Sequence, residues 1–194
     1  MPKLGMEPIR RAALVEAAIA EIGAAGSLDV TVSRIAKRAG MSAALAHHYF
    51  GGKDQILLAA MRHALTLYGR GVLAALRGQT DPRARLEAVI AAGFTEENFR
   101  PEVIAAWLNF YVMAQNDAEA QRLLRIYQRR LHSNLLHDLR PLLGARADGT
   151  ATRLAGLIDG LYLRQALLRD STGSRGANQL VRDLLDLELG RAAS

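Results

Sequence analysis

Glycine, proline and helix-capping residues divide this 194-residue chain into segments rich in Ala, Leu, Arg and Glu. These four residue types favour α-helix, and the β-branched runs that favour strands are scarce. No stretch alternates apolar and polar residues for more than a few positions, as a half-buried strand would. The sequence therefore predicts an all-α fold.

Capping residues and helix breakers set the expected boundaries of the helices. N-cap residue types stand at Thr31, Ser42, Asp81 and at Asn116 or Asp117. The expected helices are residues 8–25, 32–39, 43–50, 53–76, 82–99, a segment that opens at 101, a long helix that ends near 143, and then 150–169 and 176–189. Residues 144–149 and 171–174 are expected to form loops, and the first helix is expected to turn Ile9, Ala13, Ile19 and Ile22 toward the core.

A basic window without acidic residues runs from residue 31 to residue 53. It contains Arg34, Lys37, Arg38 and Lys53, a local charge of +4 in a chain whose net charge is +6. Folding alone does not require a window free of acids, but contact with phosphates favours one, because each neutralised phosphate releases condensed counterions. The window predicts binding to nucleic acid.

Two short helices within this window have the length and chemistry of a helix-turn-helix corner. They are joined by Ala39-Gly40-Met41-Ser42, in which Gly suits the left-handed turn and Ser caps the next helix. The second helix of such a corner enters the major groove with its N-terminus first. Phosphate contacts are expected from Thr31, Arg34, Ser42, Tyr49 and Lys53, and contacts with base edges from Ala43, Ala44, His47 and His48.

The histidines admit other interpretations. His47, His48 and Tyr49 could be ordinary surface and core residues of a small helical bundle, although the surrounding corner favours the DNA-binding role. Two adjacent histidines point in different directions on a helix, so they form a poor metal clamp. No metal site is expected.

Aromatic residues gather in one part of the chain. Five of the ten fall between residues 94 and 111, and Trp107, Phe110 and Tyr111 are spaced so that they share one helix face. Aromatic faces attract cations, so the stripe could line a cation site. Asp159, in the middle of an apolar helix, is either solvated at an edge or placed to meet a cation. The alternative is that the aromatic stripe is ordinary core.

Several functional classes are disfavoured. The chain has no Cys, which excludes disulfides, thiolate metal sites and Cys nucleophiles. Gly51-Gly52-Lys53-Asp54 lacks the leading Gly and the trailing Ser/Thr of a phosphate-binding loop, and neither His-Glu-x-x-His nor Gly-x-Ser-x-Gly occurs. Apolar runs are shorter than the ~18 residues of a membrane helix, and no signal-peptide pattern follows Met1. The chain is expected to be a cytoplasmic protein without cofactor or catalytic activity. A membrane-surface role is a further possibility, but only the net positive charge suggests it.

The corner carries a recognisable set of residues: Thr31, Ile35-Ala36, Ala39-Gly40-Met41-Ser42, His48-Tyr49-Phe50, Lys53-Asp54 and Leu57. This set resembles the helix-turn-helix signature of the TetR family of transcriptional repressors. The resemblance narrows to the branch of the family that senses choline and represses glycine betaine synthesis. The residues outside the corner that carry it are Met1-Pro2-Lys3-Leu4-Gly5-Met6, Ile9-Arg10-Arg11, Met61-Arg62, Trp107-Leu108, Phe110, Arg129-Arg130-Leu131, Ser133-Asn134-Leu135, Leu157-Ile158-Asp159-Gly160-Leu161 and Leu163-Arg164.

The resemblance implies an all-helical homodimer with about nine helices per chain, bound to a palindromic double-stranded operator. Residues 1–52 would be a three-helix DNA-binding domain, and residues 53–194 an effector-binding and dimerisation domain in which residues 53–76 connect the two. The last two helices would form a four-helix bundle with the partner chain. Their apolar residues exceed what one chain needs: Leu154, Leu157, Ile158, Leu161, Leu168, Leu180, Leu184, Leu185 and Leu187. These residues could instead be intramolecular core.

The resemblance also implies a small-molecule effector, choline or a related cation, which would tilt the connecting helix and move the two reading helices off their spacing of ~34–36 Å. The implied ligand-binding residues are Trp107, Phe110, Tyr111, Tyr127 and Asp159, with Glu96 and Glu97 as further acidic candidates. The chain departs from the branch in its reading helix, Ser42 to His48, and in Tyr111 and Tyr162, where Trp is expected. A TetR-family repressor of drug efflux or lipid metabolism, responding to another ligand, therefore remains an alternative.

Overall fold

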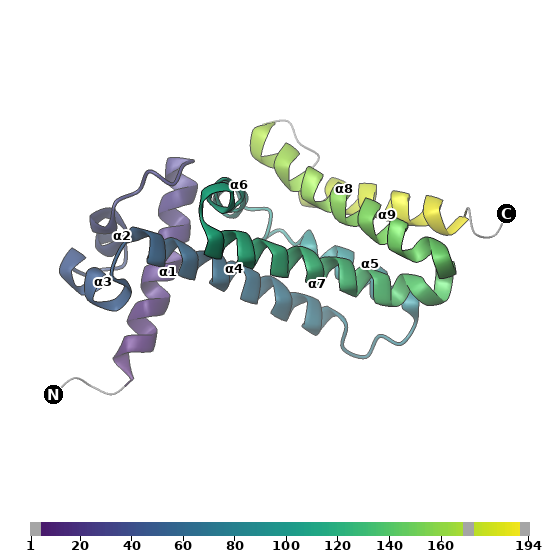
Figure 1. Ribbon diagram of the computed structural model, residues 1–194, viewed down its shortest axis with the longest axis horizontal. Coiled ribbons are helices and arrows are strands. Elements are labelled where there is room, and N and C mark those ends of the chain that lie inside the picture. Colours follow the sequence, from purple (N-terminus) through teal and green to yellow (C-terminus); the bar gives the residue numbers. More distant parts are fainter. Residues whose placement is uncertain (1–4, 169–172, 191–194) are drawn as a thin grey trace. The chain divides into compact units, whose positions relative to one another are not determined.

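The computed structural model describes residues 5–168 and 173–190, which form nine α-helices and one short 3-10 helix (Figure 1). No strand occurs in this described part, which agrees with the all-α prediction. The helices are α1 (Met6–Ala25), α2 (Val32–Arg38), α3 (Ala43–Phe50), α4 (Lys53–Ala75), α5 (Pro82–Gly93), α6 (Pro101–Asn116), α7 (Ala118–Leu143), α8 (Ala147–Leu167) and α9 (Gly173–Gly190). The 3-10 helix η1 (Gly144–Arg146) precedes α8.

The predicted corner is confirmed in its local geometry. The Thr31 side chain accepts a hydrogen bond from the backbone N–H of Arg34 at 3.2 Å and so caps α2. The Ser42 hydroxyl accepts one from the backbone N–H of Leu45 at 3.2 Å and caps α3. Between them Gly40 adopts a φ of 67°, which favours glycine because a Cβ is strained there. The capping chemistry therefore defines both short helices.

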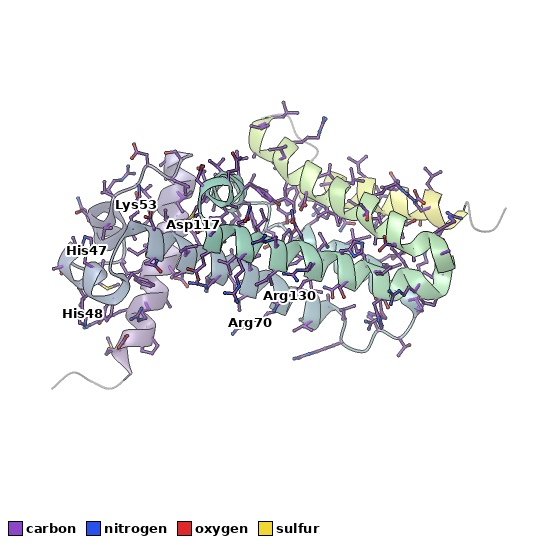
Figure 2. All side chains as sticks on the ribbon, viewed as in Figure 1. His47, His48, Lys53, Arg70, Asp117 and Arg130 are labelled. Carbon is purple, nitrogen blue, oxygen red and sulfur yellow. The ribbon has the colours of Figure 1, made fainter. Side chains whose placement is uncertain are left out.

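Two aspartates begin longer helices in the same way. The Asp81 carboxylate accepts from the backbone N–H of Ala84 at 2.8 Å at the start of α5, where Pro82 occupies the first helical turn. Asp117, labelled in Figure 2 at the start of α7, accepts from the backbone N–H of Ala120 at 2.7 Å. Of the two cap candidates at residues 116 and 117, the structure selects the aspartate.

Several helix boundaries differ from expectation. The helix expected to reach residue 99 ends at Gly93, and a turn follows in which the Thr95 hydroxyl accepts from the backbone of Asn98 while the Asn98 amide donates to the Ala92 carbonyl. The loop expected at residues 144–149 is instead η1 and the first turn of α8, which ends at Leu167. Helix α9 begins at Gly173 and not at residue 176, so residues 173 and 174 are helical where a loop was expected. Residues 169, 171 and 172, for which helix or loop was also predicted, lie outside the described residues.

The chain packs as two compact units that interleave along the sequence. The first contains the residues up to Leu65 together with Pro101–Leu123; the second contains Thr66–Arg100 and the residues from Leu124 onward. Packing and function need not divide a chain at the same place. The functional boundary expected at residue 52 stays a prediction.

In the first unit, α1 contacts α2, α3 and α6. Its core residues Leu14, Ala18 and Ile22 are completely buried, whereas Ile9 is 62% exposed, so its expected core role is wrong. At 100° per residue, the 13 positions from Ile9 to Ile22 place the two side chains about 140° apart around the helix axis. The buried face of α1 thus excludes Ile9.

The contact between α1 and α6 is closest at Gly23. A Cβ built on this glycine would lie 2.4 Å from the Cα of Glu102 and 2.4 Å from its Cβ. The first of these atoms belongs to the backbone, which cannot yield as the end of a flexible side chain can. Gly23 therefore permits a helix approach that any larger residue would prevent.

In the second unit, α9 lies against α5 and α8. Glu188 of α9 is 2% exposed, and its carboxylate accepts two hydrogen bonds from Arg153, at 2.7 and 2.8 Å, and one from the Thr150 hydroxyl at 3.1 Å. A buried carboxylate needs such partners because desolvation disfavours its charge. This network joins α9 to α8.

Substitution of Gly23 tests the helix approach. Gly23→Ala should lower the free energy of unfolding by about 1–3 kcal/mol, the usual cost of overpacking, despite the better helix propensity of Ala. Gly71→Ala in α4 is the control, because its added methyl would meet nothing within 4 Å and should be neutral or stabilising. Chemical denaturation of both variants measures the difference; equal stability would contradict the close approach.

Candidate nucleic-acid interface and effector site

Helix α3 exposes the residues expected to face DNA bases. Ala44, His47 and His48 are exposed and Ala43 is half-buried, whereas Ala46 is completely buried and anchors the opposite face. Figure 2 shows both histidines at the outer edge of α3. The Nδ1 atom of His47 lies 3.1 Å from the carbonyl oxygen of Gly51, at the end of the helix. The face of α3 that is expected to read bases is therefore accessible.

Ser42 presents the N-terminus of α3 to solvent. Its hydroxyl is exposed while it accepts from Leu45, and the first backbone N–H groups of a helix have no partner within the helix. These N–H groups and the helix dipole favour an anion at this end. The arrangement suits a phosphate.

Tyr49 is held by α1. The guanidinium of Arg10 donates a hydrogen bond to the Tyr49 hydroxyl at 3.2 Å, and the guanidinium carbon of Arg11 lies 5.6 Å from the Tyr49 ring centre and 5.1 Å from that of Phe50. These contacts add two arginines of α1 to the corner. The sequence does not reveal the pairing, because 39 residues separate Arg10 from Tyr49.

Lys53 has a structural partner. Its ammonium group donates to the carbonyl oxygen of Leu28 at 3.3 Å, which ties the first turn of α4 to the loop between α1 and α2. Lys53 is half-buried, and Figure 2 labels it beside the corner. Its expected contact with a phosphate stays a prediction.

A carboxylate from a helix outside the basic window lies against two of the arginines of the window. Glu21 of α1 pairs with Arg34, with 2.8 Å between Oε2 and Nη2, and with Arg38, with 3.4 Å between Oε1 and Nε. The window from residue 31 to 53 contains no acid in sequence, but the fold places one against it. Two of its four cations therefore face an internal anion.

The three aromatic residues of α6 share a face as predicted, but they differ in burial. Phe110 is 1% exposed and belongs to the core of the first unit, whereas Trp107 and Tyr111 are half-buried. The Trp107 ring centre lies 6.2 Å from that of Phe110, at 80°, and 6.4 Å from that of Tyr111, at 38°. The core alternative therefore holds for Phe110.

In the second unit, Tyr127 and Asp159 meet. The Tyr127 hydroxyl donates to a carboxylate oxygen of Asp159 at 3.2 Å, and the ring centre of Tyr68 lies 5.6 Å from that of Tyr127, edge to face. Burial and the Asp159 carboxylate raise the pKa of the Tyr68 hydroxyl above its ordinary value, because a second negative charge is disfavoured there. Residues of α4, α7 and α8 thus form a cluster of two tyrosines and one carboxylate.

Tyr68 was missed by sequence reasoning, which considered only the aromatic residues of later helices. It lies 59 residues before Tyr127, and neither periodicity nor spacing indicates that they meet. A single tyrosine in a long helix gives no local signal of a site.

The other acidic candidates do not join this cluster. Glu96 and Glu97 are exposed, and Glu96 pairs with Arg175 at 3.5 Å. Their segment lies after the end of α5, in the turn where a helix was expected. The nearby aromatic group consists of Phe94, Phe99 and Tyr162, with ring centres 5.0–5.7 Å apart, and the Tyr162 hydroxyl donates to the Gly93 carbonyl.

The predicted ligand-binding residues are divided between the compact units. Trp107, Phe110 and Tyr111 belong to the first unit, and Tyr127 and Asp159 to the second. Their union in one pocket stays a prediction.

Within the described ranges, no three His, Asp or Glu side chains gather as metal ligands would. His132 faces Asp148 at 3.5 Å, and His137 faces Asp138 at 3.8 Å, while Asp138 also pairs with Arg85 at 2.7 Å. None of the helices in those ranges combines the length and the hydropathy needed to cross a membrane.

Comparison with known protein families finds a match for each half of the chain. Residues 14–60 match the family of bacterial regulatory proteins called the tetR family, and residues 82–190 match the C-terminal domain of BetI-type transcriptional repressors. The HTH-type transcriptional regulator BetI of Brucella melitensis is 52% identical over 190 residues, which cover 97% of this chain and 96% of that protein. The regulator of the same name from Agrobacterium fabrum is 50% identical, with coverage of 97% and 92%.

A solved structure shows the same fold. The chain superposes on a transcriptional regulator from Saccharomonospora viridis, crystallised in complex with choline, with a TM-score of 0.81 and 24% identity over 91% of this chain and 95% of that one. The curated relatives are DNA-binding regulators, and this chain is likewise a repressor and not an enzyme. The chain belongs to the TetR family of bacterial transcriptional regulators and carries a BetI-type C-terminal domain.

Proposed function

We propose that this repressor is a cytoplasmic homodimer that binds a palindromic operator and controls the synthesis of glycine betaine from choline, a response to osmotic stress. Choline, or a related quaternary ammonium, releases it from the operator. The observation that carries the proposal is the cluster of Tyr68, Tyr127 and Asp159 in the second unit.

This cluster has the chemistry that a quaternary ammonium requires. Such a cation offers no hydrogen-bond donor, so it is attracted by aromatic faces and by a full negative charge. Tyr127 is 6% exposed and donates to Asp159, which holds the carboxylate in place, and the raised pKa keeps Tyr68 uncharged. A cation beside Asp159 would compensate a carboxylate that has lost part of its hydration.

The relatives support the same ligand. The BetI-type match covers the C-terminal half of the chain, and a neighbour in fold was crystallised with choline. The resemblance in sequence includes Asp159 itself. A repressor of drug efflux or lipid metabolism would instead respond to lipophilic ligands, which the same titration would reveal.

DNA binding is assigned to the corner. We propose that Ala43, Ala44, His47 and His48 face base edges, and that phosphates are contacted by the flanking residues Thr31, Arg34, Ser42, Tyr49 and Lys53. Exposure of the reading face of α3 and the free N-terminal end of that helix support the assignment.

The predicted ligand-binding residues of α6 are linked to the corner within the first unit. Helix α6 carries Trp107 and Tyr111 and packs on α1, which in turn contacts α2 and α3. A ligand held by the α6 aromatic residues would therefore act on α1 directly, besides acting through α4. A coupling of about 1–3 kcal/mol per site would give a several-fold to hundredfold loss of operator affinity.

Dimerisation is assigned to α8 and α9. Of the apolar residues named for this role, Leu154, Ile158, Leu161 and Leu185 are core within the chain, whereas Leu168, Leu180 and Leu187 are 44–52% exposed. Helix α8 also has a stripe of Gly156, Gly160, Leu163 and Leu167, spaced so that all four share one face; Gly160 is half-buried and the other three are exposed. Small residues beside exposed leucines suit close packing with a partner helix.

Asp159→Asn tests the effector site. It should leave operator affinity within about twofold of wild type and raise the choline concentration needed for release by about tenfold or more, because the cation loses its counter-charge. The control is Glu97→Gln, which removes an exposed acid of the same unit. Operator binding is measured by fluorescence anisotropy against increasing choline.

Wild-type protein should ignore 3,3-dimethylbutan-1-ol, which has the shape of choline without the charge. Release by this alcohol, or an unchanged response of Asp159→Asn, would contradict a cation site at Asp159. Release by lipophilic ligands alone would favour the alternative family role.

Ser42 tests the DNA assignment. Ser42→Asn and Ser42→Asp both keep a side-chain oxygen that can cap α3, so both should fold with melting temperatures near that of wild type. The aspartate places a negative charge where a phosphate is expected and should weaken operator binding by about tenfold or more. Equal binding by the two variants would show that this helix end does not approach DNA.

Leu167→Glu tests the dimer. A carboxylate placed in an apolar interface should raise the dissociation constant of the dimer by about a hundredfold or more. Leu73→Glu is the control, because Leu73 on α4 is 67% exposed, similar to the 64% of Leu167. Analytical ultracentrifugation distinguishes the two; dimers of equal strength would place the interface elsewhere.

A further inference from the structure

Glu21 occupies an unusual place for an acid in a DNA-binding unit. Its side chain is only 12% exposed, and both carboxylate oxygens are directed at arginines of α2. The neighbouring acid of α1, Glu16, is exposed and has no ion pair within the described residues. Glu21 is therefore built into the unit, whereas Glu16 lies on its surface.

The geometry joins three charges across two helices. Arg34 and Arg38 are one helical turn apart and share the face of α2 that meets α1. One carboxylate oxygen lies 2.8 Å from Arg34 and the other 3.4 Å from Arg38, so each guanidinium forms an ion pair with a different oxygen. The two side chains remain 54% and 43% exposed, which leaves both guanidinium groups open to solvent on one side.

We propose that Glu21 competes with DNA phosphates for Arg34 and Arg38 and so limits the affinity of this repressor for DNA of any sequence. This inference rests on the proposed role of the α2–α3 corner in DNA binding. In such a corner the first helix crosses the phosphate backbone. A guanidinium that is already paired with a carboxylate must give up that pair before it contacts a phosphate, so the contact gains less.

Lys37 shows the contrast on the same helix. It is exposed and has no ion pair within the described residues, so its charge is available to a phosphate without any exchange. Glu21 therefore acts on two of the three basic residues of α2. Because non-specific DNA binding is almost entirely electrostatic, such control acts first on sequences other than the operator.

The test compares Glu21→Gln with Glu16→Gln, which removes the same charge from the exposed surface of the same helix. Each full-length protein is titrated into a labelled 30-base-pair duplex without the operator at a series of KCl concentrations. Glu21→Gln should tighten binding several-fold at 0.1 M KCl and steepen the slope of log K against log salt by about one for each arginine that reaches a phosphate. Glu16→Gln should change the slope by much less.

The same pair of substitutions is then made in an Arg34→Gln/Arg38→Gln background. There Glu21→Gln should have no more effect than Glu16→Gln, because the arginines that it frees are absent. Equal effects of the two glutamate substitutions in the wild-type background, or weaker binding by Glu21→Gln at an unchanged slope, would overturn the proposal.

Two further variants complete the test. Glu21→Asp keeps the negative charge but moves it back by one methylene, so it should shift the salt slope in the same direction by a smaller amount. This variant replaces Glu21→Gln in the test if circular dichroism shows that Glu21→Gln is unfolded. Comparison of the wild-type protein with Ser42→Asp distinguishes a failure of the DNA assignment from a failure of the proposed competition. Wild-type binding that is indifferent to Ser42→Asp would contradict the DNA assignment itself, whereas loss of binding by Ser42→Asp with no effect at Glu21 would contradict only the competition.

Discussion

The packing of α1 is the constraint on which the first unit depends. One helix contacts the α2–α3 corner and also α6, and the buried residues Leu14, Ala18 and Ile22 lie along it. At Gly23 the backbone of α6 comes so near that no side chain fits between the helices. Because a packed core has discrete arrangements and does not deform continuously, a displacement of α6 must be transmitted to α1. The contact that holds the corner in place is therefore also the route by which a ligand on α6 would act on it under the proposed function.

Within the first unit, a carboxylate of α1 offsets part of the positive charge of the corner. The basic window is free of acids over 23 residues of sequence, yet Glu21 reaches it from α1 and pairs with Arg34 and Arg38. Arg10 and Arg11 approach Tyr49 and Phe50 from the same helix. The electrostatic surface of the corner is thus set by two helices together. A net charge counted along the sequence overstates the number of cations that are available to phosphates.

The second unit has a different electrostatic problem, which is a carboxylate held among aromatic side chains. Asp159 receives the Tyr127 hydroxyl, and Tyr68 lies against Tyr127. Glu188, buried in the same unit, pairs with the guanidinium of Arg153 and accepts a hydrogen bond from the Thr150 hydroxyl. The cluster of Tyr68, Tyr127 and Asp159 combines aromatic rings with a carboxylate, an environment that a quaternary ammonium would complement.

The sequence by itself determined the features that depend on neighbours along the chain. The all-α class, the caps at Thr31, Ser42, Asp81 and Asp117, and the shared face of Trp107 and Tyr111 all follow from helical spacing and local hydrogen bonds. Only the tertiary structure decided which distant residues meet, such as Glu21 with Arg34 and Tyr68 with Tyr127. It also decided that Phe110 belongs to the core, and it turned Ile9 to solvent. The physical reason is that helix periodicity specifies which residues share a face, whereas the partner of that face depends on how the helices pack.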